Sequence, residues 1–434
     1  MEFMERKCVY VWHIYGLCMS WLFIPSVYVA INICLLVRTM ARQASEFAPE
    51  NFISTMPDNV VTNILDRLPL QVAVRTGILS KHWRFKWTML SQLSIDEEFF
   101  KYLILEKGVN NFGEIISKLI FHLNGTITKC FLFLYEMDVE DINRWISILS
   151  KKKVIDLAIK NWSKTQVDLS THLFSCLELK HLKLHKCIFN PPSRFHGFPN
   201  LLSLELRMVQ FGISDFGEFF TRCLLLEILN VDHSVSKGNI KLDEIAKLKN
   251  LKVLSLSLCD LDTQTIISSH NIFELVGFLS KLQELGLDFQ DYKLADGALM
   301  EFPTAFPRLK ALKLSGIDLG NGIMLSCAFE MIRHFPNLQT LDLEITAIQR
   351  NADPIPEVDY HHTSGLRSVV FRSFEGSESE VSLINYILAC SPFLKEIAIH
   401  PRVDLEHTKQ MMFARKLLKL PRASPLAEID FYHF

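Results

Sequence analysis

The sequence predicts an α/β protein in which a short module of three helices precedes a long repeat solenoid built on a parallel β-sheet. One leucine-rich phrase recurs ten times between residues 150 and 400, and residues 51–97 before it show helical apolar spacing. Of the 434 residues, 49% are hydrophobic and 22% are charged, so the chain can bury a large core. The length suits two or three domains.

Charge and motif content exclude several classes of function. The net charge is −2 and the basic run Lys151-Lys152-Lys153 is short, which argues against a nucleic-acid partner. The ten cysteines are scattered without a C-x-x-C pair, so we expect buried, reduced thiols and a reducing compartment. The pair His361-His362 lies in a Pro-rich loop without a third ligand at useful spacing, so we expect no metal. No phosphate-binding, dinucleotide-binding or hydrolase motif occurs, so we expect no cofactor and no enzyme.

Residues 1–50 form an N-terminal extension that contains an apolar segment. Residues 8–37 hold no Asp, Glu, Lys or Arg, and about 20 apolar residues suffice to span a bilayer. Arg38 and Arg42 follow the segment, which favours a cytosolic body if the segment spans a membrane. Alternatively Met40 starts the working protein, and the extension is dispensable. Both interpretations stay open, and we expect the body in the cytoplasm or nucleus, with membrane association if residues 8–37 are retained.

Residues 51–97 predict three short helices. Pro57 suits the first turn of a helix, and Asp58 favours its N-terminal end. Pro69 ends this helix, Gly77 ends a second one, and Ser80 is a suitable N-cap for a third. The first helix carries an apolar stripe made of Val61, Ile64, Leu65 and Leu68. Such short helices bury little among themselves, so their apolar faces need the rest of the chain or a partner.

The phrase L-x-x-L-x-L repeats with conservative substitutions. Its second position lies at residues 157, 182, 204, 229, 254, 285, 312, 341, 369 and 397, at intervals of 22 to 31. This period matches leucine-rich repeats, in which each phrase forms one strand of a parallel sheet. The leucines then point into the core and the residues between them point out of the concave face. We expect helices or turns at residues 213–220 and 327–335 on the other side.

Two flanking segments are expected to close the repeats. Ahead of them, Phe131, Phe133, Trp145 and Ile146 are expected to form an N-terminal cap on the first open core. After them, the region 358–434 shows two repeat-like strands around a helix. The apolar residues of this helix are Val381, Leu383, Ile384, Ile387 and Leu388.

The helical module resembles the plant F-box, in residue order and in spacing. The matching residues are Met56-Pro57-Asp58, Ile64-Leu65, Leu68-Pro69, Val72 to Thr76, Leu79-Ser80-Lys81, Trp83-Arg84 and Trp87. The family usually has Leu where this chain has Met56. The resemblance implies docking on a Skp-type adaptor, which links the F-box to a cullin and a RING subunit. The adaptor contacts that it implies are Pro57, Ile64, Leu65, Leu68, Pro69, Leu79 and Trp83.

The C-terminal region resembles the FBD domain that ends many plant F-box proteins. The residues that carry this resemblance are Leu366, Val369, Phe374, Gly376, Glu380, Ile384, Tyr386-Ile387-Leu388, Leu394 and Ile397. The predicted division is therefore an extension at 1–50, an F-box at 51–97, leucine-rich repeats with their cap at 98–357, and an FBD-like region at 358–434.

Together these resemblances imply the substrate-recognition subunit of a Skp-cullin-F-box (SCF) ubiquitin ligase, whose repeats bind a target protein. The expected target contacts flank the central leucines on the concave face. They are Lys183, His185, Glu205, Arg207, Asn230, Asp232, Ser255, Asp288, Lys313, Glu344, Arg372 and His400. The alternatives are a membrane-tethered repeat scaffold without a ligase role, and an F-box protein that binds the adaptor but never reaches a cullin.

Overall fold

The computed structural model describes most of the chain after residue 55. The described residues are 56–107, 111–211, 216–233, 240–261, 269–290, 306, 308–319, 321–346, 365–403 and 405–432. The N-terminal extension with its apolar segment 8–37, and the pair His361-His362, therefore lie outside the described residues. The chain divides into two compact units. The helical unit contains the described residues up to 94 together with 122–125, and the repeat unit contains 95–121 and the chain from 126 onward.

The helical unit consists of short helices that begin after proline residues. Pro57 precedes α3 (Asp58–Leu65) and Pro69 precedes α4 (Leu70–Arg75), each with extended backbone at the N-cap. Two 3-10 turns follow, η2 (Thr76–Ile78) and η3 (Lys86–Met89). The third predicted α-helix is thus absent from this unit, although the Ser80 hydroxyl accepts a hydrogen bond from the Trp83 amide at 3.2 Å as a cap would.

An aspartate joins the first helix to the end of the unit. The Asp66 carboxylate, one residue after α3, accepts hydrogen bonds from the Ser91 backbone N–H at 2.9 Å, the Ser91 hydroxyl at 2.5 Å and the Gln92 backbone N–H at 3.1 Å. Gln92 opens strand β1 (Gln92–Ile95). Hydrogen bonds to a charged acceptor are stronger than neutral ones, so this carboxylate holds the end of α3 against residues 91 and 92.

The repeat unit is built on one long parallel sheet. Its strands follow the order β2-β3-β5-β7-β9-β10-β11-β12-β13-β14-β15-β16. Their bounds are Lys129–Leu134, Asp156–Asn161, His181–His185, Ser203–Arg207, Ile228–Asp232, Val253–Ser257, Glu284–Asp288, Ala311–Ile317, Thr340–Ile345, Ser368–Phe374, Glu396–Pro401 and Glu428–Phe431. A second small parallel sheet holds β4 (Val167–Asp168), β6 (Cys187–Phe189) and β8 (Gln210–Phe211).

The predicted leucine phrases form the strands and their core. Leu182 of β5 pairs with Leu204 of β7, and the same position stays in register along the sheet to Ile397 of β15. The three phrase positions in every copy are at most 2% exposed. The prediction of a leucine-rich-repeat sheet is therefore confirmed. The sheet continues with β2 before the first phrase and β16 after the last one.

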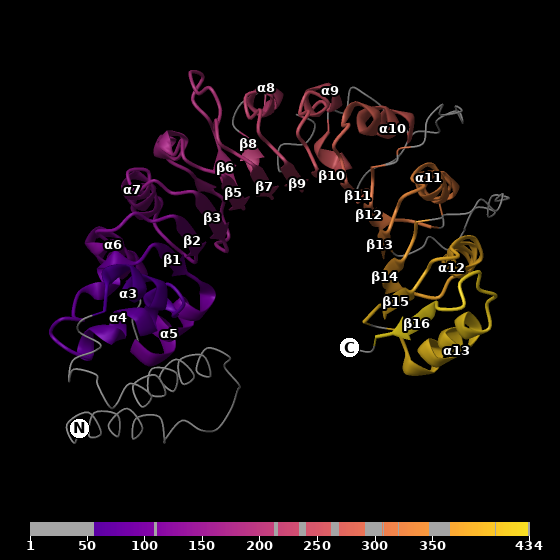
Figure 1. The fold of residues 1–434 in the computed structure, drawn as a ribbon, viewed down its shortest axis with the longest axis horizontal. Helices are drawn as coiled ribbons and strands as arrows, with labels where there is room; N and C mark the ends of the chain where they lie inside the picture. Colours follow the sequence, from indigo (N-terminus) through magenta and orange to yellow (C-terminus); the bar gives the residue numbers. More distant parts are fainter. Residues whose placement is uncertain are drawn as a thin grey trace. The chain divides into compact units, whose positions relative to one another are not determined.

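Helices cover one face of the sheet (Figure 1). The phrase leucines are buried, so they point toward this covered face. They are α7 (Val139–Leu149), α8 (Phe216–Thr221), α9 (Leu242–Ile245), α10 (Ser269–Phe278), α11 (Gly322–His334) and α12 (Glu378–Cys390). The predicted helix at 327–335 is thus part of α11, and α8 contains the end of the predicted segment 213–220. We call the opposite face of strands β3 to β15 the open face.

The N-terminal cap differs in part from the expectation. Helices α5 (Glu97–Lys107) and α6 (Phe112–His122) precede β2, and Trp145 of α7 is buried and donates a hydrogen bond to the Ser117 hydroxyl at 2.8 Å. Phe131 and Phe133, however, alternate with the core-facing Cys130, Leu132 and Leu134 of β2. They therefore lie on the side of the open face, because successive residues of a strand point to opposite sides. Phe133 is nevertheless buried, at 5% exposed, and packs edge-on against the Phe100 ring of α5 with ring centroids 5.8 Å apart, so it belongs to the cap as predicted.

The C-terminal end has a capped helix and a tight turn. A capping box begins α12: the Ser377 hydroxyl accepts from the Glu380 amide, and the Glu380 carboxylate accepts from the Ser377 amide. Gly376, before the cap, has a φ of +83°. Helix α13 (His407–Leu418) then leads to β16.

We searched the described helices for membrane spans. None of them combines the length and the apolar composition that a bilayer crossing requires.

Candidate functional site

The predicted adaptor contacts divide into buried and accessible residues. Leu65 and Trp83 are 0% and 4% exposed, so they belong to the core and present no surface to a partner. Pro57 is exposed and Leu79 is 60% exposed. The half-buried residues are Ile64, Leu68 and Pro69.

The structure adds accessible apolar residues to this set. Ile78 is 69% exposed and Phe85 is 63% exposed, on either side of the turn that holds Ser80. A single exposed leucine is ordinary on a protein surface. Here three large apolar side chains are exposed within eight residues: Ile78, Leu79 and Phe85. Such a cluster is typical of an interaction surface. Helical spacing could not identify Ile78 and Phe85, because residues 76–89 hold two short 3-10 turns and the link between them rather than an α-helix.

The twelve predicted target contacts lie in two rows across the open face. The central row pairs Lys183 with Glu205, Glu205 with Asn230, Asn230 with Ser255, and Gly286 with Lys313 in adjacent strands. The second row lies two residues further along each strand. Its members are His185, Arg207, Asp232, Asp288, Glu344, Arg372 and His400.

Ion pairs between neighbouring strands neutralise much of the charge in these rows. Lys183 bonds Glu205 at 2.8 Å, and Arg207 bonds Asp232 at 3.0 Å. Arg372 donates from Nε and Nη2 to the Asp342 carboxylate at 2.9 and 3.1 Å, in a two-point contact. The pKa of Arg372 rises, chiefly because of this hydrogen bond. Asp342 is a central-row residue that sequence reasoning did not select.

An aromatic cluster lies where strands β2, β3 and β5 end. Trp162, 58% exposed, stacks between Phe133 and His185, with ring centroids 6.4 Å away on each side. The Lys160 ammonium lies 5.1 Å from the Trp162 ring centroid and 5.9 Å from that of Phe133. We call Phe133, Trp162 and His185 the aromatic platform. Of the three, sequence reasoning had placed only His185 among the target contacts.

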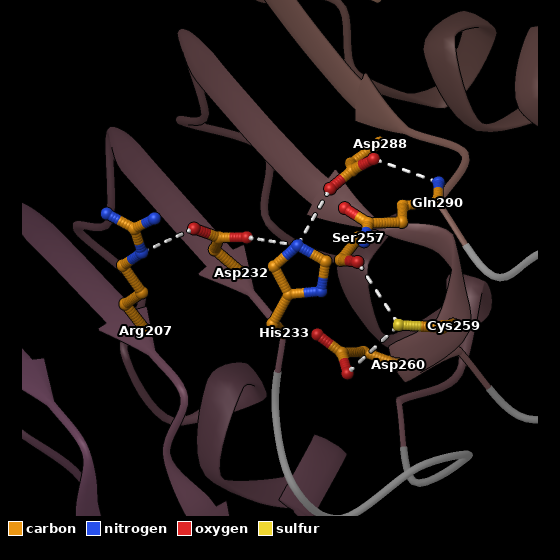
Figure 2. A network of polar contacts seen from close by, with 8 residues as sticks. All are labelled: Arg207, Asp232, His233, Ser257, Cys259, Asp260, Asp288 and Gln290. Carbon is orange, nitrogen blue, oxygen red and sulfur yellow. Dashed lines mark hydrogen bonds and ion pairs between the residues drawn. The ribbon is translucent and has the colours of Figure 1, made fainter. Parts of the chain in front are cut away.

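A second cluster lies between strands β9 and β11. Figure 2 shows the Asp232 and Asp288 carboxylates directed at the same nitrogen of His233. The His233 Nε2 lies 3.5 Å from Asp232 Oδ1 and 3.1 Å from Asp288 Oδ2. Asp232 and Asp288 had been expected on this face, but His233 had not.

The buried thiols take no part in these sites. Burial raises the pKa of Cys176 and Cys223 to about 11, and that of Cys187 and Cys327 to about 12. A thiol that stays protonated is a poor nucleophile and a poor metal ligand. These four cysteines are therefore core residues, as the sequence predicted.

The fold and these surfaces define a class: a leucine-rich-repeat protein that carries a small helical module with an exposed apolar turn. Family models match three parts of the chain. They are the F-box domain at residues 53–94, the LRR repeats of FBD-associated F-box protein At5g56370 at 142–268, and the FBD at 363–399. The chain thus has the domains of the plant F-box/FBD/LRR-repeat family, as its motifs predicted.

Relatives from Arabidopsis thaliana match over most of their length. The F-box/FBD/LRR-repeat protein At1g13570 is 27% identical over 88% of this chain and 98% of its own. The putative FBD-associated F-box protein At5g56560 is 25% identical over 87% of this chain and 98% of its own. A solved chain from the Rad7 and Elc1 complex in yeast aligns with 94% of this chain and 98% of its own, at 13% identity and a TM-score of 0.37.

The domain content indicates a general role. An F-box joined to leucine-rich repeats suggests a substrate adaptor of SCF complexes, and F-box/LRR proteins are generally non-catalytic adaptors.

Proposed function

We propose that this chain is the substrate-recognition subunit of an SCF-type ubiquitin ligase. Its F-box, residues 51–97, docks on a Skp-type adaptor and through it reaches a cullin and a RING subunit. The repeats, residues 98–357, hold a target protein on the open face, and residues 358–434 close the array. The chain itself catalyses no covalent step. It raises the effective concentration of the target protein near a ubiquitin-charged enzyme.

The exposed apolar turn of the helical unit carries this proposal. Ile78, Leu79 and Phe85 are each at least 60% exposed. Burying one such side chain in a partner contributes about 1.5–3 kcal/mol, and the entropy cost of association offsets part of this gain. Pro57, Ile64, Leu68 and Pro69 are accessible in the same unit and extend the proposed adaptor surface. Leu65 and Trp83 support this surface from the core.

The open face supports the second half of the proposal. Its charged rows are largely paired across strands, so they select a partner by complementary polar contacts rather than by a strong field. The aromatic platform supplies the apolar anchor that a protein interface needs, because an exposed Trp is a common hot-spot residue. We therefore place the target protein across the platform and the adjoining rows.

Adaptor capture tests the first half of the proposal. We expect the double variant Ile78→Ala/Leu79→Ala to recover at least about tenfold less Skp-type adaptor than wild type, because about 2 kcal/mol of apolar burial is lost. Leu426→Ala is the matched control, since Leu426 is 73% exposed in the repeat unit. Equal adaptor recovery by wild type and the double variant, with circular dichroism showing that both are folded, would contradict the docking.

Proximity labelling with the proteasome inhibited tests the second half. Target proteins should be labelled by the full chain and by a version without residues 51–97, whereas adaptor and cullin should be labelled by the full chain alone. Trp162→Ala should reduce labelling of the targets and leave the adaptor unchanged. Persistence of adaptor and cullin without the F-box would refute the assignment of that region.

A further inference from the structure

Strand register brings three potential metal ligands together over one small residue. Asp232 ends β9 and Asp288 ends β11, while Ser257 ends β10 between them and pairs with Asp288. Ser257 is 1% exposed. Because its side chain is short, the two carboxylates approach each other above it.

A backbone turn brings the third group. His233 follows β9 with a φ of +46°, in the left-handed region. Lys186 after β5 and Met208 after β7 have φ values of +56° and +51°, so this turn recurs in successive repeats. In this repeat alone of the three the turn residue is a histidine. Its ring nitrogen therefore meets the two carboxylates on the open face (Figure 2).

The separations suit coordination by one ion. One atom from each of Asp232, His233 and Asp288 lies within 4.8 Å of the others. The two contacts of His233 Nε2, at 3.1 and 3.5 Å, bracket the distance of about 3.3–3.4 Å between ligands on a tetrahedral Zn²⁺ with bonds of about 2.0–2.1 Å. All three side chains are half-buried, so a small ion can reach them from solvent.

Hydrogen bonds alone stabilise these three side chains less well than a bound cation would. The Nε2 atom of an imidazole carries at most one proton, yet two carboxylate oxygens face it. The carboxylates also repel each other. A divalent cation accepts a lone pair from all three atoms at once and balances both negative charges.

The outer oxygens of both carboxylates are held in place by other groups. Arg207 Nε donates to Asp232 Oδ2 at 3.0 Å, and the backbone N–H of Gln290 donates to Asp288 Oδ1 at 2.9 Å. The inner oxygens, Oδ1 of Asp232 and Oδ2 of Asp288, are thereby turned toward His233. Such outer contacts orient ligands in known metal sites.

We propose that Asp232, His233 and Asp288 bind a divalent transition-metal ion, with Zn²⁺ as the best fit to one imidazole and two carboxylates. Three protein ligands leave a fourth position for water or for a donor atom of a bound molecule. The site is independent of adaptor docking, and it can bind the ion whether or not the proposed function holds.

Cobalt titration tests the site in the full chain after treatment with a chelator. Co²⁺ substitutes for Zn²⁺ and absorbs visible light strongly when tetrahedral. We expect one equivalent of tetrahedral Co²⁺ without the thiolate charge-transfer band that cysteine ligands cause, displaced by Zn²⁺. Asp288→Asn and His233→Gln should each weaken this binding by at least about tenfold, since even supporting residues of metal sites contribute that much. Asp342→Asn, a carboxylate of the central row paired with Arg372, is the control and should bind normally.

Several results would overturn the proposal. Wild type that binds no Co²⁺ or Zn²⁺, unchanged binding by both variants, or a thiolate band would each do so. Thermal unfolding of each variant, measured in the presence of a chelator, shows whether the metal-free variant is folded. Should neither variant fold, Zn²⁺ must still raise the melting temperature of wild type and shift the His233 ring resonances, and a failure of either would reject the site.

Discussion

The indole of Trp162 stacks on the imidazole of His185, with ring centroids 6.4 Å apart and ring planes 21° apart. Each ring lies at the end of a strand in adjacent repeats, so the stack joins β3 to β5 on the open face. His185 Nδ1 is also 3.1 Å from the backbone carbonyl oxygen of Asn161. These contacts hold the imidazole in a fixed orientation within a group of cationic side chains.

The pKa of His185 should therefore lie below its ordinary value of 6.5. Partial burial is the main cause and the charges of Arg207, Lys160 and Lys186 add to it, although the hydrogen bond to Asn161 opposes them. NMR titration of the His185 ring should give a midpoint below 6.5, and Lys160→Met should raise that midpoint. Lys129→Met is the control, because Lys129 pairs with Asp156 instead. A midpoint above 6.5 would contradict this account of the charges.

The effect of this shift on stability has a definite sign. The unfolded chain takes up the His185 proton at a higher pH than the folded chain does. The contribution of His185 to the free energy of unfolding is therefore fully present above about pH 6.5, and it declines as the pH falls from there toward the folded-state pKa. Stacking by a neutral ring should be strongest in the same range.

The repeats could be predicted because each copy follows a local rule. Leu182 and Leu184 point inward by strand alternation alone, and ten copies with one period exclude chance. The F-box motif likewise identified the helical unit. It did not distinguish Trp83, which is buried, from Leu79, which is exposed, since a family pattern includes core residues and contact residues alike.

The clusters on the open face could not be predicted in the same way. Trp162 lies one residue beyond β3, and its neighbours Phe133 and His185 come from other repeats. The cluster at His233 depends on a left-handed turn at a residue other than glycine, for which the sequence has no reliable signal. Both clusters arise from register and turn geometry, which exist only once the sheet is assembled.

Gly376→Ala should destabilise the C-terminal end by about 2–4 kcal/mol, from a left-handed backbone and an overlap in a packed region. Gly376 has a φ of +83°, and a Cβ there would overlap the Phe413 ring of α13. Urea unfolding, together with hydrogen exchange of α13, measures the loss.

Gly277→Ala is the matched control for this substitution. Gly277 lies in α10 and a Cβ there would make only an ordinary contact with Phe306 at 3.5 Å. We expect it to be neutral or stabilising by about 0.5–1 kcal/mol, because Ala favours helix over Gly. Equal effects at both positions would show that neither the backbone nor Phe413 constrains Gly376.

Glu380 should contribute to stability through two hydrogen bonds in spite of its burial. Its carboxylate accepts from the Glu375 amide at 3.0 Å and from the Ser377 amide at 2.6 Å, and the side chain is 0% exposed. Glu380→Ala leaves both amides without this acceptor, at a cost of about 2–4 kcal/mol. Hydrogen exchange of these two amides should accelerate by at least about tenfold. Glu378→Ala, an exposed residue of the same helical turn, should change stability by no more than about 0.5 kcal/mol.

The Glu380 carboxyl also makes the stability of the folded chain depend on pH. Burial raises the pKa of Glu380 above its ordinary 4.5, although the two amides and the Ser377 hydroxyl lower it. The folded chain therefore keeps this proton to a higher pH than the unfolded chain does, and stability falls as the pH rises from 4.5 through the folded-state pKa. Comparing urea unfolding of wild type and Glu380→Ala across this range isolates the effect. A difference between the two chains that does not change with pH would mean that the Glu380 carboxyl has the same pKa folded and unfolded.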